Sequence, residues 1–192
     1  MINLNFFKLL RVGGWINTLN IKLFIKLSSI LIKPDILEIG THHGRSIIPI
    51  IKSNKKINNT VLIDIFSNQK LNISKSGSGD KKILLSNLKK FDIDLSKIKI
   101  LNQSSFKFLS YYKKYISPIK FDLIHIDGGH SKKEVSNDLN IASKCSKKHS
   151  IIILDDIFNP SFPNVLEAYL NYKTKFYTIF LSDQKIFLSK DK

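Results

Sequence analysis

Four ionisable side chains in the second half of the chain could perform chemistry together. Asp127 and His130 follow one apolar segment, and Asp155 and Asp156 follow the next apolar segment along the chain. Neighbouring parallel strands lie ~4.8 Å apart and end at the same edge of a sheet, so the three carboxylates would converge there. Like charges held together raise one another's pKa unless a cation neutralises them. Because oxygen ligands suit Mg²⁺, Mn²⁺ or Ca²⁺ better than zinc, we predict a divalent cation, foremost Mg²⁺, at Asp127, Asp155 and Asp156.

His130 has two candidate roles beside such a cation: it could be a ligand, or it could be a general base. A hydroxyl bound to a cation loses its proton more readily, and His130 or a carboxylate could take that proton. Without a cation, Asp155 or Asp156 would only cap the next turn, and Asp127 would hold the amino group of a cofactor. We therefore predict His130 and Asp127 as the catalytic residues, and expect His125 to be a core histidine with a local partner.

A second motif, early in the chain, has the form of a ligand-binding turn. A short apolar segment that contains Glu38 is followed by Gly40 and Gly44, and then by the apolar residues 47–51. This order is typical of a strand, a tight turn and a helix. Gly40 can adopt the positive φ that the turn needs, and Gly44 would let the start of the helix lie close to a ligand. A dinucleotide-binding turn needs a glycine where His42 stands, which disfavours an NAD-dependent oxidoreductase without removing it as an alternative.

The elements that must position these groups alternate along the chain. We predict strands at 35–39, 60–65, 97–101, 121–126 and 150–154, with helices at 47–51, from 81 onward, at 106–115, from 132 onward and from 163 onward. The last two apolar segments, 176–181 and 185–188, are close enough to form an antiparallel hairpin. The alternation predicts an α/β fold, a Rossmann-like doubly wound sheet that is mostly parallel, with helices on both faces. We expect residues 1–33 to form a helical cap segment and residues 34–192 to form a single domain.

These motifs resemble those of class I S-adenosylmethionine-dependent methyltransferases. The pattern Glu-x-Gly-x-x-x-Gly-x-Ser begins at Glu38, Asp-Gly-Gly-His begins at Asp127, and Asp-Asp begins at Asp155. Together they look like those of small bacterial metal-dependent O-methyltransferases, over residues 34–188. Asp64, 26 positions after Glu38, would then accept hydrogen bonds from both ribose hydroxyls of the cofactor. The resemblance implies cofactor binding by Glu38, Gly40, Thr41, Gly44, Ser46, Asp64, Ser104, Ser105 and Asp127.

The same resemblance limits the acceptor to a class. The Asn-Pro-Pro-Tyr-type motif used for base or amide nitrogens does not follow the fourth predicted strand. We therefore expect O-methylation of a small hydroxylated molecule, such as a sugar or natural product. The net charge of +16 keeps a nucleic-acid-binding module, or an RNA methyltransferase, as an alternative. The lysines are scattered, however, as expected from an AT-rich genome.

Length and composition indicate the number of domains and the compartment of the protein. The 192 residues suit one domain with a sizeable core, and the single cysteine, Cys145, fits a reducing compartment, so we expect a cytoplasmic protein. No apolar run is long enough for a membrane span. Residues 19–33 are amphipathic and basic, so they could lie on a membrane surface, although packing on the domain is the commoner use of such a helix. The sequence leaves the oligomeric state open.

Overall fold

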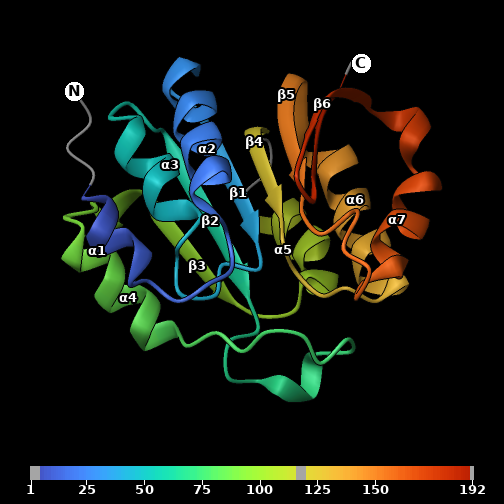
Figure 1. The fold of residues 1–192 in the computed structure, drawn as a ribbon, viewed down its shortest axis with the longest axis horizontal. Helices are drawn as coiled ribbons and strands as arrows, with labels where there is room; N and C mark the ends of the chain where they lie inside the picture. Colours follow the sequence, from blue (N-terminus) through green and yellow to red (C-terminus); the bar gives the residue numbers. More distant parts are fainter. Residues whose placement is uncertain (1–4, 116–119, 191–192) are drawn as a thin grey trace.

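The computed structural model describes residues 5–115 and 120–190. Seven strands form one sheet in the order β3-β2-β1-β4-β5-β7-β6 (Figure 1). The strands β1 to β5 pair in parallel, and β7 runs antiparallel to both β5 and β6. The predicted doubly wound sheet with a C-terminal hairpin is therefore confirmed. The strands are β1 Asp35–Ile39, β2 Asn59–Asp64, β3 Ile98–Asn102, β4 Phe121–Ile126, β5 Ser146–Leu154, β6 Tyr177–Ser182 and β7 Lys185–Ser189.

Helices cover both faces of the sheet and enclose two apolar cores. The helices α1 to α4 supply buried side chains to one core, and α5 to α7 supply them to the other (Figure 1). The α-helices are α1 Phe6–Leu10, α2 Thr18–Ile30, α3 Ile47–Ser53, α4 Lys81–Lys90, α5 Phe108–Tyr115, α6 Lys132–Cys145 and α7 Pro163–Leu170. Short 3₁₀ turns are η1 Gln69–Leu71, η2 Leu95–Lys97, η3 Ser105–Lys107 and η4 Lys173–Lys175.

Local signals explain where several helices begin. Asp80 caps α4, since its side chain accepts hydrogen bonds from the backbone N–H groups of Lys82 and Ile83. Ser131 and Glu134 form the predicted capping box at the start of α6. Pro49 lies in the first turn of α3, where backbone N–H groups have no partner inside the helix, so it costs no hydrogen bond.

The segment before β1 packs on the domain. In α2, Ile21 and Phe24 are fully buried and belong to the same core as residues of α3. The helix covers 18–30 rather than the predicted 19–33, because the chain turns extended at Leu31, three residues before Pro34. No helix among residues 5–115 and 120–190 is both long and apolar enough to cross a membrane.

Candidate functional site

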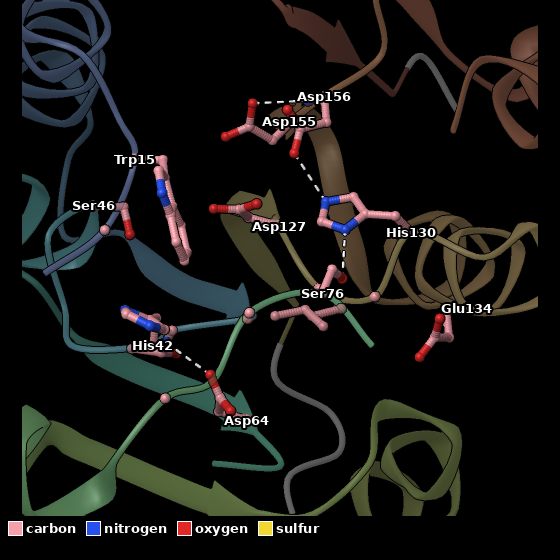
Figure 2. Close-up of a pocket in the computed structure, with 18 of the residues that line it drawn as sticks. Trp15, His42, Ser46, Asp64, Ser76, Asp127, His130, Glu134, Asp155 and Asp156 are labelled. Atoms are coloured by element: carbon pink, nitrogen blue, oxygen red, sulfur yellow. Dashed lines mark hydrogen bonds and ion pairs between the residues drawn. The ribbon is translucent and has the colours of Figure 1, made fainter. Parts of the chain in front are cut away.

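A cavity of about 540 Å³ opens at the carboxyl ends of the parallel strands (Figure 2). The loops after β1 to β5 line it, together with residues 13–17 and the turn between β6 and β7. Its volume is in the range of pockets that hold small molecules or cofactors. The predicted site residues that line it are Gly40, Thr41, Ser46, Asp64, Ser104, Ser105, Asp127, His130, Asp155 and Asp156.

Two of the predicted cofactor residues lie away from the cavity surface. Glu38 is fully buried below it, where Oε1 accepts a hydrogen bond from Ser46 Oγ at 2.6 Å. Gly44 has a φ of +91°, and an added Cβ would lie 2.9 Å from the side chain of Leu84. Gly44 therefore serves close packing with α4, and Glu38 lies below the lining in contact with Ser46.

Buried charges form a row across the ends of four neighbouring strands. Glu38 of β1 lies 2.8 Å from Nδ1 of His125 in β4, and Nε2 of His125 lies 3.9 Å from Asp155. Lys185 of β7 contacts Asp155 from the other side, and all four side chains are almost completely buried. Negative and positive groups alternate along the row in the order Glu38, His125, Asp155, Lys185. His125 is thus a core histidine with local partners, as the sequence suggested.

The row shifts the ionisation of its members. Burial opposes charge on His125, but its bonds to Asp155 and Glu38 outweigh burial and raise its pKa to about 9. Burial also opposes charge on Asp155, yet contact with His125 and Lys185 lowers its pKa to about 2. At neutral pH His125 is therefore a cation and Asp155 an anion.

Asp127 lies at the centre of the candidate site, and no lysine or arginine of the described residues forms an ion pair with it. Burial, and then the negative charge of Asp155, raise its pKa well above the usual range. Ligand-type atoms of Asp127, His130 and Asp156 lie within 4.8 Å of one another, and so do those of His125, Asp127 and Asp155. The predicted trio of aspartates is therefore divided between two groups that share Asp127.

His130 is held from three sides. Its Nδ1 lies 2.7 Å from Ser76 Oγ, and its Nε2 lies 2.9 Å from Asp156 Oδ2 (Figure 2). The ring stacks on Phe162 with centroids 3.9 Å apart. Nε2 is buried against Asp156, and it makes no aligned hydrogen bond to the described residues.

The opposite end of the cavity has groups that suit a polar ligand. Asp64 accepts hydrogen bonds from the backbone N–H groups of His42, at 2.7 Å, and Phe66, at 2.5 Å. Each carboxylate oxygen keeps a further acceptor position. Thr41 Oγ1 and Gln103 Nε2 are buried at the lining without a hydrogen-bond partner among the described residues. Buried polar atoms of this kind are normally satisfied, so they are fitted to a ligand.

The site also contains residues that the sequence did not reveal. Trp15 and Asp138 line the cavity, as do Lys185 and Gln103. Trp15 is 81% exposed and faces the cavity beside His42, with ring centroids 5.3 Å apart (Figure 2). The Gly13-Gly14 break between α1 and α2 was a signal for a turn there, but not for a residue at the site.

Asp138 leads to a prediction about stability. Burial, with a smaller contribution from the charge of Glu134, raises its pKa to about 7 although Ser105 and Asn137 bond to it. An acid whose pKa is higher in the folded than in the unfolded state destabilises the fold as pH rises from about 4 to 7. Asp138→Asn should therefore stabilise the protein at pH 8 by on the order of 2 kcal/mol, and much less at pH 4. Thermal unfolding of both proteins at the two pH values measures this, and an equal offset at both would contradict it.

Known proteins with similar sequences include a methyltransferase family and one viral protein. Residues 37–157 match the sequence model of a family described as a methyltransferase domain. An uncharacterized protein of Acanthamoeba polyphaga mimivirus is 30% identical over 120 residues, which are 62% of this chain and 50% of that protein. The chain thus matches about half the length of this curated relative.

Solved structures share the fold. An O-methyltransferase from Bacillus cereus in complex with SAH has a TM-score of 0.73 at 17% identity, covering 95% of this chain and 86% of that one. The O-methyltransferase TomG from Streptomyces achromogenes, involved in tomaymycin synthesis and in complex with SAM, has a TM-score of 0.69 at 14% identity, covering 93% and 82%. At these identities the likeness establishes the architecture, while the roles of individual residues rest on the cavity.

Proposed function

Because the chain belongs to this family of methyltransferase domains, we propose that it transfers a methyl group from S-adenosylmethionine to a hydroxyl oxygen of a small acceptor, assisted by a divalent cation. The observation that carries the proposal is a single cavity with two different ends. One end presents Asp64 and unpartnered polar atoms, and the other presents Asp127, His130 and Asp156. A reaction that brings a cofactor and an acceptor together needs both ends in one enclosed space.

The first end fits the cofactor. The carboxylate of Asp64 can accept hydrogen bonds from ribose hydroxyls, and it is held in place by the backbone of His42 and Phe66. Thr41 and Gln103 offer buried polar atoms that need a partner. Ser104 and Ser105 lie on the same lining, where the resemblance assigns adenine. His42 adopts a positive φ and its ring borders the cavity, in place of the glycine that a dinucleotide turn requires.

The second end fits a divalent cation. Asp127 and Asp156 offer carboxylate oxygens, and magnesium is commonly held by one or two carboxylates with water and substrate completing its shell. Burial, and then the charge of Asp155, raise the pKa of Asp127 even though His125 and Lys185 oppose this, so its negative charge is costly. Such a cation, when bound, would lower the pKa of the acceptor hydroxyl.

The residues around this end can handle the acceptor's proton. His130 lines the cavity and can take a proton from a hydroxyl, because Asp156 stabilises the imidazolium that forms. Ser76 Oγ shares a hydrogen bond with Nδ1 and keeps the ring oriented. The remaining task is positioning, since the sulfonium of S-adenosylmethionine is already an activated methyl donor.

Cofactor choice tests the proposal directly. Calorimetry should show binding of S-adenosylmethionine and little or no binding of NAD. Asp64→Asn should weaken the cofactor by about tenfold to a hundredfold, since hydrogen bonds to a charged group contribute roughly 1.5–3 kcal/mol. Asp183→Asn is the matched control, because Asp183 also lines the cavity but accepts a hydrogen bond from Asn17 at 2.8 Å. Tight binding of NAD with no response to S-adenosylmethionine would refute the methyl-transfer proposal.

A further inference from the structure

We propose that Lys185 neutralises Asp155 and withholds this carboxylate from the divalent cation, which Asp127 and Asp156 bind instead. The inference rests on the cation of the proposed function. It changes the ligand set expected from the three aspartates, because one of them already has a permanent cationic partner.

The partner is fixed by the fold. Lys185 begins β7, which pairs with β5 so that Ile186 lies opposite Leu154, directly before Asp155. The side chain of Lys185 is 5% exposed, and its Nζ donates to Asp155 Oδ1. Removing one member of a buried ion pair leaves an uncompensated charge, which is strongly unfavourable. The pair therefore persists when other ligands enter the cavity.

Asp155 has little capacity left for a metal ion. Its Oδ1 accepts hydrogen bonds from Lys185 and from the backbone N–H of Asp156, the latter at 2.8 Å. Its Oδ2 faces Nε2 of His125 at 3.9 Å. A divalent cation at Asp155 would have to approach the ammonium group of Lys185 at close range.

Asp127 and Asp156 differ from Asp155 in the partners of their carboxylates. Asp127 accepts no side-chain hydrogen bond from the described part of the chain, although it retains access to the cavity. Asp156 contacts His130 through Oδ2 and accepts a hydrogen bond from Asn159 through Oδ1. No lysine or arginine forms an ion pair with either aspartate among residues 5–115 and 120–190.

Direct binding of Mn²⁺ tests the assignment without an activity measurement. Free Mn²⁺ is followed by electron paramagnetic resonance in titrations of the full chain. The double variant Asp155→Asn with Lys185→Met removes both charges of the pair together. Its affinity for Mn²⁺ should stay within about threefold of the wild type, whereas Asp156→Asn should weaken binding at least tenfold. Equal weakening in the double variant and Asp156→Asn would overturn the assignment.

The single variant Lys185→Met should change the affinity for Mn²⁺ in the opposite direction to Asp156→Asn. It frees Asp155 and removes a repelling charge, so the affinity for Mn²⁺ should rise severalfold. Unchanged or weaker binding by a folded Lys185→Met protein would count against withholding by Lys185. If the Lys185→Met protein does not fold, the Mn²⁺ affinity of the double variant alone tests the assignment. Absence of Mn²⁺ binding to the wild type would overturn the proposed cation together with this inference, while wild-type binding that the double variant loses would overturn the inference alone.

Discussion

Asp127→Asn is expected to lower the rate of methyl transfer by on the order of a hundredfold or more, since metal-assisted activation of an oxygen contributes several kcal/mol. Asp127 belongs to both groups of ligand-type atoms at the site and lies between the cofactor end and the acceptor end of the cavity. Its loss should therefore weaken Mg²⁺ and, more modestly, S-adenosylmethionine. Rates measured with and without EDTA, at saturating cofactor, give the test.

Activity measured in EDTA distinguishes a metal-binding role of Asp127 from a purely structural role. Wild-type activity should disappear in EDTA and return with added Mg²⁺, while the residual activity of Asp127→Asn should respond to neither. Asp183→Asn serves again as the matched change at the rim of the cavity. Full wild-type activity in EDTA, with Asp127→Asn still active, would mean that these aspartates only cap turns, and that His130 is a metal-free general base.

Loss of activity in Asp127→Asn should not come from unfolding. The pKa of Asp127 is raised in the folded protein, so its ionised form destabilises the metal-free fold at pH values above the unfolded-state pKa near 4. Asparagine removes this cost. The metal-free variant should accordingly melt at a higher temperature than the wild type at pH 8, and at about the same temperature below pH 4.

The fold could be predicted because its signals are local. Apolar segments of strand length, the cap at Asp80 and the Ser131–Glu134 capping box each lie within a few residues of the element they define. The alternation of elements then leaves few topologies, and the short link between the last two apolar segments indicates the final hairpin. For the same reason most of the candidate site was predictable, since strand ends gather at one edge of the sheet.

The parts that escaped prediction depend on contacts between distant segments. Lys185 begins the last strand, and nothing near it in the sequence indicates that β7 pairs beside β5 and places its ammonium group at Asp155. Glu38 has the sequence position of a ligand residue, but its register opposite His125 directs it into the buried charge row. Trp15 lies at the cavity next to Gly14, whose carbonyl oxygen accepts a hydrogen bond from Arg45 Nη1 at 2.8 Å, a contact between segments 31 residues apart.

The turn after β1 accepts only glycine at position 40. We therefore expect Gly40→Ala to prevent stable folding. The φ of Gly40 is +86°, and an added Cβ would lie 1.8 Å from the backbone oxygen of Asp127. Neither backbone can move away easily. Gly40 N–H donates to Ile63 O at 2.9 Å, and Asp127 N–H donates to Ile39 O at 2.8 Å. The collision should cost more than about 4 kcal/mol, a large part of the stability of an ordinary domain.

Gly77→Ala is the matched control for Gly40→Ala, because it isolates backbone strain from collision. Gly77 also has a positive φ, +67°, but an added Cβ would meet no atom within 4 Å. Its replacement should cost only about 1–2 kcal/mol, the usual penalty of a left-handed conformation for an L-residue. Thermal unfolding should then show a loss of a few degrees for Gly77→Ala, against a protein that is insoluble or unfolded at 25 °C for Gly40→Ala. Similar melting temperatures for the two variants would show that the backbones of β1 and β4 can separate at this point, and that the turn tolerates a side chain.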